Sequence, residues 1–564
     1  MTEGLKSRGS CTGAIYRYMI IVLALAVVLS ALITRIAAAP FRITSLIRET
    51  NVVDVACEAV TNDYYILLKG SVVTNIQSAA DIKLGAVAAV MLVDPDPSSD
   101  HAFYRAVRIP QATPRDTDGD GVDDVFELRR EYLDALDAAD GKIDHDGDGI
   151  ATYIEYGYET DPGDSNSVPD VTTGLDSDGD GFQDVYEIVH FADRYNPTSM
   201  PTATIYVDAA AVGFGDGSVT NPYPDIKSAF EVAGEYDIIE VADGVYTGVM
   251  NRALSFPNAA PVMLMSKNGP AGCVIDCEHD TYAISFSTIP DSRWVLDGVT
   301  VRHGSATRGG AFNAQNASPL VRGCRLIDNS AEDYGGAVYA QDTGRLVLEN
   351  CFIKGNTSGI GGGISLWASG SVLRNCFIVE NTAGKGGGIH LKGVPCTLQN
   401  CTIAGNVGST KDGSLHAAYA GAVASLTNCI VWGNLPSSVS GTDPIVAYST
   451  FEGGHFGQGN QNVDPRLTIA TYRLRGESPC IDTGTSNAPP SDADGELRWD
   501  APAHSNAVSV VDMGADEFVD IDGDGLGDAW ERVHFGDLAH GADEDDDAGA
   551  GPDGLTNLKE YGTV

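Results

Sequence analysis

The sequence has few basic residues for its length. It holds 35 Lys and Arg against 78 Asp and Glu in 564 residues, which gives a formal net charge of −43. A polyanion of this kind is repelled by nucleic acid and by anionic membrane surfaces, so the composition argues against both as partners. It favours divalent cations instead.

The N-terminus lacks a hydrophobic run of the ~20 residues that a membrane-spanning helix usually needs. Three basic residues precede a shorter uncharged run over 18–34, and an A-x-A pattern ends at Ala39. This order is typical of a secretory signal peptide over residues 1–39. Because Pro40 would hinder cleavage there, an uncleaved anchor is the alternative, and a membrane would be contacted only through it. In both cases we expect the mature chain outside the cytoplasm.

The repeated part of the chain, residues 296–434, lacks helical periodicity. A short phrase of the form Leu-x-Asn-Cys, with variants, returns six times there, and Gly-Gly phrases lie between the copies. Each period of ~25 residues holds three short runs in which apolar and polar residues alternate, with Gly and Asn supplying the turns. Three strands and three turns make one coil of a parallel β-helix, so we predict an all-β solenoid with stacked equivalent residues.

The cysteines of the repeat are poorly placed for disulfides. Stacked strands hold neighbouring Cβ atoms ~4.8 Å apart, whereas a disulfide needs ~3.8 Å. We therefore expect a reduced, buried column. We interpret Cys273 and Cys277 as strand residues of an early coil, with a metal or redox pair as the alternative. The column consists of Cys324, Cys351, Cys376, Cys401 and Cys429.

Two sets of asparagines recur with the same period. In a stack, each amide would bond to the next one and satisfy turn backbone that would otherwise lack partners. We therefore predict two internal amide ladders. The first is Asn350, Asn375, Asn400 and Asn428, and the second is Asn329, Asn356, Asn381, Asn406 and Asn434.

The repeated phrases resemble those of known protein families. The repeat resembles the right-handed parallel β-helix superfamily that includes pectate lyases. Its GGA/GGI and Asn-Cys phrases look most like the repeats of chlamydial polymorphic outer-membrane proteins and related bacterial surface proteins. Residues 203–290, with a helix over 225–233, resemble the N-terminal cap of such proteins, and residues 446–517 resemble their C-terminal region. The resemblance implies a β-helix with both caps over 203–517, in a secreted, extracellular or bacterial cell-surface protein.

Four acidic loops match the calcium-loop pattern D-x-D-x-D-G, followed by Glu at the twelfth place. Ca²⁺ takes about six to eight hard oxygens, and alternate residues of a tight loop turn their carboxylates toward one point. The seventh residue gives its carbonyl, and the twelfth closes the site. We predict Ca²⁺ as the cofactor, with a solvated acidic linker as the alternative. The predicted ligands are Asp116, Asp118, Asp120, Val122, Asp124 and Glu127; Asp144, Asp146, Asp148, Ile150 and Glu155; Asp176, Asp178, Asp180, Phe182, Asp184 and Glu187; and Asp520, Asp522, Asp524, Leu526, Asp528 and Glu531.

The acidic loops resemble thrombospondin type 3 repeats and the dockerin-like calcium repeats of secreted bacterial proteins, which implies a structural role. Short helices are expected after the loops, over 124–139 and 184–191. A fifth copy ending at Glu560 is degenerate, and we expect it to bind weakly or not at all. The predicted order is a small β module of about six strands over 41–110, calcium repeats over 111–200, the β-helix over 203–517 and dockerin-like repeats over 518–564.

One outward strand face of the β-helix is the candidate ligand face. Alternation turns Ser365, Trp367, His390 and Lys392 outward and places Trp367 beside Lys392 on the next coil. An exposed aromatic ring is a stacking platform for a sugar, so Trp367 is the candidate ligand-binding residue. His390, Lys392 and Lys411 are low-grade catalytic candidates, because a lyase acting on uronates needs a base and a cation.

The sequence therefore predicts a calcium-binding β-helix protein that serves adhesion or polysaccharide binding, with a polysaccharide or cell-surface glycan as partner. Three readings of the candidate face stay open: a solvated polar face, a glycan-binding face and a catalytic one. The enzymatic alternative is a pectate-lyase-like polysaccharide lyase that cleaves acidic glycans by β-elimination. No coil offers three acidic residues on the face to hold the required cation. The balance favours binding over catalysis.

Overall fold

The structure is a computed structural model of the chain. It describes residues 42–49, 52–71, 74–97, 102–171, 174–256, 261–287, 294–342, 345–367, 370–393, 395–418, 421–436, 439–504, 508–538, 540–541, 556–557 and 561. The predicted signal region and the degenerate fifth loop lie outside these ranges. The chain divides into two compact units, Met1–Pro169 and Asp170–Val564, so the division falls between the second and third acidic loops.

The first unit begins with six antiparallel strands, which confirms the small β module predicted there. Alternate residues of one sheet, such as Val53 and Val55, pack against one face of the other sheet through Leu67. The opposite face of that second sheet, through Ile66, packs on Val125, which lies within the first acidic loop. The module therefore supports this loop. The sheets are β1 (Ile43–Glu49), β2 (Val52–Ala59) and β5 (Ala88–Asp94), and β4 (Ser78–Leu84), β3 (Asp63–Gly70) and β6 (Phe103–Pro110).

Short helical segments accompany the acidic loops: α2 (Asp124–Glu127), η1 (Asp140–Lys142), α3 (Thr152–Tyr158), α4 (Asp184–Val189) and α6 (Asp528–His534). The expected helix over 124–139 is wrong in length, because α2 ends at Glu127. The carboxylate of Asp140 accepts the backbone N–H of Asp134 at 2.6 Å. Such local side-chain bonds compete with helical ones, and the segment forms turns.

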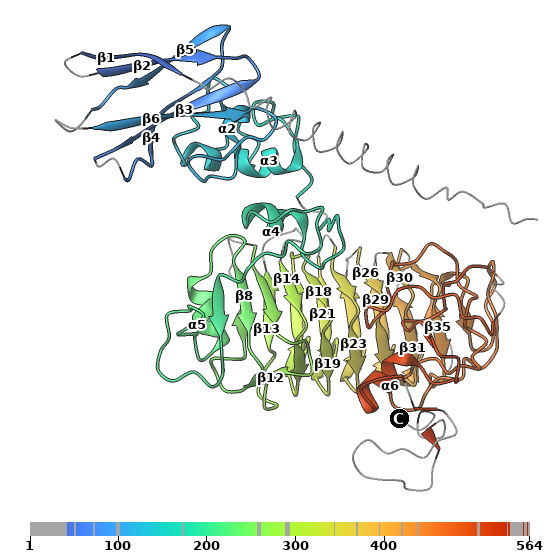
Figure 1. Ribbon diagram of the computed structural model, residues 1–564. Helices are drawn as coiled ribbons and strands as arrows, with labels where there is room; N and C mark the ends of the chain where they lie inside the picture. The colour runs from blue at the N-terminus through green and yellow to red at the C-terminus, as the bar shows by residue number, and fades with distance from the viewer. Residues whose placement is uncertain are drawn as a thin grey trace, which may run out of the picture. The chain divides into compact units, whose positions relative to one another are not determined.

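The second unit is built on a parallel β-helix of about seven turns, as predicted. Figure 1 shows its coils side by side, each lying against the next. Every strand pairs in parallel with its equivalent one coil away, as Trp367 does with Lys392. The three expected sheets are joined by a fourth, five-stranded one, because the segment between the second asparagine ladder and the Gly-Gly turn is also extended.

The strands of the β-helix, in the order in which they pair, are as follows. The first sheet holds β10 (Leu254–Ser255), β13 (Ile284–Ser287), β17 (Phe312–Gln315), β21 (Val338–Gln341), β25 (Ile364–Trp367), β29 (Ile389–Lys392), β33 (Leu415–Ala418) and β36 (Ser440–Gly441). The second holds β37 (Ile445–Ala447), β34 (Ala424–Thr427), β30 (Cys396–Gln399), β26 (Val372–Arg374), β22 (Val347–Glu349), β18 (Leu320–Arg322), β14 (Val295–Asp297), β11 (Met263–Ser266), β8 (Ile238–Val241) and β7 (Ile205–Val207). The third holds β38 (Thr450–Phe451), β35 (Ile430–Trp432), β31 (Thr402–Ala404), β27 (Phe377–Val379), β23 (Phe352–Lys354), β19 (Arg325–Ile327), β15 (Thr300–Arg302), β12 (Cys273–Asp276) and β9 (Gly244–Tyr246). The fourth holds β16 (Ser305–Arg308), β20 (Ser330–Tyr334), β24 (Thr357–Ile360), β28 (Thr382–Lys385) and β32 (Val407–Lys411).

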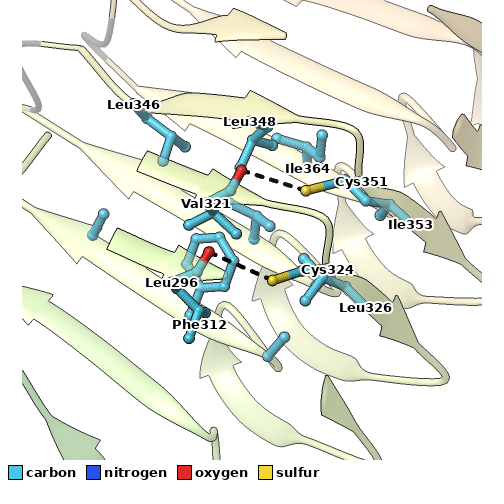
Figure 2. Packing of buried hydrophobic residues seen from close by; sticks show 14 of the residues in the cluster. Leu296, Phe312, Val321, Cys324, Leu326, Leu346, Leu348, Cys351, Ile353 and Ile364 are labelled. Carbon is cyan, nitrogen blue, oxygen red and sulfur yellow. Dashed lines mark hydrogen bonds between the residues drawn. The ribbon is translucent and has the colours of Figure 1, made fainter. Parts of the chain in front are cut away.

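The cysteine column is confirmed. Its five members are buried and unbridged, as are Cys273 and Cys277. Figure 2 shows how the thiols of Cys324 and Cys351 point into the core toward backbone carbonyls one coil away, at 3.7 Å from Leu296 and 3.4 Å from Val321. The thiols therefore act as small apolar side chains that also donate weakly to strand carbonyls.

The second asparagine ladder is continuous. Each side-chain amide donates to the next amide oxygen, as between Asn356 and Asn381 at 2.9 Å, and also to a backbone carbonyl one coil back. The first ladder is shared with a later part of the chain. The amides of Asn375 and Asn400 donate to the carbonyls of Ser491 and Asp512. The first ladder thus fastens the C-terminal region to the side of the β-helix.

Caps close both ends of the core. The predicted N-terminal helix is α5 (Ile226–Val232), whose Ile226 and Phe230 join the hydrophobic cluster of the first coils. A second cluster contains Cys480, Phe518 and Trp530, so the fourth acidic loop and α6 are part of the C-terminal cap. Among the described residues, no helix is both long and apolar enough to cross a membrane.

Candidate metal sites and a basic aromatic cleft

The four acidic loops share one backbone geometry. In the first loop, the carboxylate of Asp116 accepts the N–H groups of Gly119 at 2.6 Å and of Gly121 at 3.0 Å. Both glycines have positive φ, 84° and 98°, which is why glycine occupies these places. The first aspartates of the other three loops make the same pair of bonds with distances of 2.7–3.0 Å. The loops are therefore preshaped by their own first aspartate.

Several of the other carboxylate oxygens are buried and lack hydrogen-bond partners. In the first loop, both oxygens of Asp118, one of Asp120 and both of Glu127 are buried without a partner. Glu187 and Glu531 also have two such oxygens each. A buried, unpaired carboxylate is costly unless a cation compensates it. These donors are hard oxygens, so they fit a calcium ion by chemistry as well as by arrangement.

The acidic groups lie close enough to share an ion. Donor atoms of the first three aspartates lie within 4.8 Å of one another in the first, second and third loops. Burial, followed by the charge of these aspartates, raises the pKa of Glu127 to about 9 and the pKa of Glu155 to about 7. The same causes raise the pKa of both Glu187 and Glu531 to about 8. The loops thus concentrate negative charge that a divalent cation would neutralise.

The aspartates at the ninth place make different contacts. Both oxygens of Asp124 are bonded to Thr117, one to its N–H and one to its hydroxyl, each at 2.8 Å. Asp184 makes the same two bonds to Ser177. Asp528 accepts the N–H of Ile521. The structure therefore shows these three aspartates closing their loops, and ligation of an ion by them stays a prediction.

At the seventh place, all four loops carry an apolar side chain. Val122, Phe182 and Leu526 are buried, and Ile150 is half-buried. Leu526 joins the hydrophobic cluster of the C-terminal cap, and an apolar side chain at this place can contribute only its backbone carbonyl to an ion. An apolar side chain is compatible with this place, because the seventh residue of a calcium loop ligates through its backbone carbonyl.

The third loop packs on the β-helix within the second unit. Nε2 of His190, which follows α4, lies 2.9 Å from the carbonyl of Tyr236, and the rings of Tyr186 and Tyr236 meet edge to face at 5.6 Å. Arg322, on the outer side of the second sheet, reaches to within 3.4 Å of where a Cβ of Gly181 would lie. The loop is thus attached to the solenoid at two places.

The candidate ligand face contains a cleft of about 300 Å³, here called the basic aromatic cleft. As predicted, Ile364, Leu366, Ile389 and Leu391 point into the core, so their neighbours in sequence point out. The fourth sheet adds the other wall. The cleft is lined by Tyr334, Ile360, Trp367, Lys385, His390, Lys392, His416 and Ala418.

Trp367 and Lys392 are adjacent in the cleft, as the register predicted. Nζ of Lys392 lies 3.4 Å from the centre of the Trp367 ring, a cation–π contact, and the ring of Tyr334 meets Trp367 edge to face at 4.6 Å. Trp367 is consequently half-buried, with one ring face under the ammonium group. This cover could not be predicted from the sequence, because it depends on a side-chain rotamer.

His390 points outward but is only 4% exposed. Its Nδ1 lies 2.9 Å from the hydroxyl of Ser365, and its ring stacks on that of His416 at 5.6 Å. Burial, followed by the charges of His416, Lys392 and Lys385, lowers the pKa of His390 to about 3. A neutral, hydrogen-bonded imidazole in this position supports the cleft wall and is a weak base near neutral pH.

The other predicted residues lie around this cleft. Lys411 pairs with Lys385 through the backbone of the fourth sheet. Glu332 and Asp333 are exposed in an irregular part of β20, and neither lines the cleft. Arg308, which was not predicted, lies over the ring of Tyr339 at 5.4 Å and extends the basic and aromatic stripe by one coil.

Another acidic cluster was not predicted, because its members come from separated segments. Asp492, Asp494 and Asp516 lie within 4.8 Å of one another in the C-terminal cap. The guanidinium group of Arg473 bonds both Asp494 and Asp516, and the N–H of Leu474 donates to Asp516 at 2.7 Å. An arginine thus already occupies the place that a cation would take.

The comparison with family models agrees with the β-helix. A family model described as the right handed beta helix region matches residues 284–431. Among solved structures, pectate lyase Pel9A is 14% identical over 56% of this chain and 97% of its own, with a TM-score of 0.28. A rhamnogalacturonan lyase is 10% identical over 48% of this chain and 91% of its own, with a TM-score of 0.22. No curated protein matches the chain.

Proposed function

We propose that this is an exported, calcium-stabilised β-helix protein that binds an acidic polysaccharide at the basic aromatic cleft. One observation carries the proposal. In a chain with a formal net charge of −43, the cleft is lined by two lysines, two histidines and two large aromatic rings, and no carboxylate is among its lining residues. A surface that departs this far from the charge of the whole chain favours an anionic ligand.

The chemistry of the lining suits a uronic acid. A sugar ring presents apolar C–H faces that stack on aromatic side chains, which Tyr334 and Trp367 provide. The carboxylate of the sugar would pair with the ammonium group of Lys392 or Lys385. Because equivalent positions repeat along the solenoid, successive sugars of an extended chain would follow the axis across neighbouring coils.

The acidic loops would provide calcium-dependent rigidity rather than ligand contacts. Their unpaired inward carboxylates support this role, since each occupied site removes repulsion among buried charges. At a calcium concentration tenfold above a site's dissociation constant, the site would stabilise its loop by ~1.4 kcal/mol. Several such sites would stiffen the region 111–200 and the C-terminal cap.

The test is binding of polygalacturonate and alginate by the full chain in calcium, with neutral dextran as the comparison. Trp367→Ala and Lys392→Ala should each weaken binding about tenfold, because each removes one of the two contact types. Lys267→Ala is the matched control, since this exposed lysine directly follows β11 of the second sheet and does not line the cleft. Equal binding by all variants, or equal binding of dextran, would refute the proposal.

A polysaccharide lyase is the second candidate, and the presence of two lysines in the cleft favours it. A lyase would remove the proton next to the uronate carboxylate with a base and neutralise that carboxylate with a cation. Lys392 is engaged with Trp367, and the cleft lining offers no carboxylate for a cation. Unsaturated-uronate absorbance that disappears in Lys392→Ala or Lys411→Ala would establish the lyase. Binding without such absorbance would favour the binder.

A further inference from the structure

We propose that Asp140, which lies outside the loop motif, is an additional ligand of the first metal site and couples that site to the second loop. The inference rests on the proposed binding of calcium by the acidic loops. It adds a ligand that the twelve-residue pattern does not contain, and it predicts an order of occupancy among the sites.

The geometry places Asp140 at the first site. Donor atoms of Asp120, Glu127 and Asp140 lie within 4.8 Å of one another, and all three residues are buried. Their exposed fractions are 3%, 1% and 7%. The segment that carries Asp140 also touches the site directly, because a Cβ added to Gly141 would lie 2.0 Å from Oδ2 of Asp120.

Unpaired carboxylate oxygens from the two segments lie together at this place, as the ligands of a cation would. Oδ1 of Asp140, Oδ2 of Asp120 and both carboxylate oxygens of Glu127 are buried without a hydrogen-bond partner. The second oxygen of Asp140 is used, since it accepts the N–H of Asp134 at 2.6 Å. One oxygen of Asp140 therefore holds the side chain in place through a hydrogen bond. The other oxygen is available to ligate an ion at the first site.

Asp140 also lies a few residues before the start of the second loop. Asp140 opens η1 (Asp140–Lys142), and Asp144, the first ligand of the second loop, follows two residues after η1 ends. The two loops also contact each other. The hydroxyl of Tyr156, in α3, donates to Asp123 at 2.6 Å, and its ring meets Phe126 edge to face at 4.8 Å. An ion held by Asp140 at the first site would fix the entry to the second.

The experiment is hydrogen exchange of the intact chain, read by mass spectrometry, across a titration with calcium chloride. Peptides over 116–127 and 144–155 report the two coupled loops, and peptides over 176–187 and 520–531 serve as internal references. In the unmodified chain we expect the first two loops to become protected together, at a lower calcium concentration than the references.

The test variant is Asp140→Asn, whose amide oxygen can still accept the N–H of Asp134 while the ligand charge is lost. We expect it to raise the calcium midpoint of the first loop about tenfold, to raise that of the second loop as well, and to leave the references unchanged. Asp137→Asn is the matched control, because it removes the same charge from an exposed position in the same segment.

The possible results separate the two claims. A first-loop midpoint that moves less than twofold in Asp140→Asn, or moves equally in Asp137→Asn, would overturn the role of Asp140. A first-loop shift with no change in the second loop would overturn the coupling. Loops of the unmodified chain that do not respond to calcium at all would instead overturn the proposed calcium binding.

Discussion

At the scale of single residues, the β-helix depends on polar groups that repeat in register. Every asparagine of the second ladder is buried, and inner members such as Asn381 are bonded on both sides along the stack. A hydrogen bond of this type contributes modestly, but leaving its partners buried and unpaired costs more. The ladder is therefore more sensitive to a single substitution than an apolar position of similar size.

Asn381→Ala tests this sensitivity. The change removes bonds to Asn356, to Asn406 and to the carbonyl of Ile353, so we expect the free energy of unfolding to fall by about 3 kcal/mol. Chemical denaturation followed by circular dichroism in the strand region measures it. Asn268→Ala is the control, because that exposed amide bonds only at the surface. Equal losses in the two variants would contradict the ladder's role.

At the scale of elements, each acidic loop contains residues that shape its backbone and a buried carboxyl group that costs free energy. The first aspartate and the glycines shape the loop, while the buried glutamate at the twelfth place lacks hydrogen-bond partners in three of the four loops. If the loop binds calcium as proposed, the loop and its short helix are destabilised without the cation and stabilised with it. Replacing this glutamate should therefore stabilise the loop and its helix without calcium and destabilise them with calcium.

Glu187→Gln separates these effects in the third loop. Without calcium, the variant should protect α4 more than the unmodified chain does, because the cost of burying an ionisable carboxyl group near four aspartates is gone. With calcium, it should protect α4 less, because the closing bidentate ligand is lost. Hydrogen exchange of residues 176–190 in chelator and in calcium measures both. A change of the same sign in both conditions would argue against a metal site.

Several features of these elements were predictable from sequence, and others were not. The spacing of Asp176, Asp178 and Asp180 identifies a loop, because its ligands are local in sequence. The role of Asp140 and the early end of α2 at Glu127 were not predictable, since both follow from a side chain that folds back on the first site. Likewise, the register paired Trp367 with Lys392, but the ammonium group over the ring is a tertiary contact.

At the scale of the molecule, one chain combines two sources of stability. The β-helix is held by a continuous core and by ladders that need no ion. The proposed calcium binding would make the acidic loops depend instead on neutralisation of their carboxylates. Removal of calcium should therefore act unevenly along the sequence, even though the loops and the solenoid belong to one chain.

Chelation of the full chain tests this uneven dependence. We expect residues 111–200 to become sensitive to protease at least tenfold faster in chelator, while the coils over 284–431 stay protected. Timed proteolysis with mass mapping of the fragments measures both regions in one sample. Magnesium-free buffer with added calcium is the control. Cleavage rates that are the same with and without chelator would count against the structural role of calcium.

The sequence by itself determined the β-helix, its register, its buried cysteine column and the acidic loops, because each is written in a short period or a contiguous motif. The tertiary structure decided what surrounds these features: the half-covered Trp367, the buried His390, the arginine among the cap aspartates and the reach of Asp140 to another loop. Those depend on side chains brought together from separate segments, where distance in space bears no fixed relation to distance along the chain.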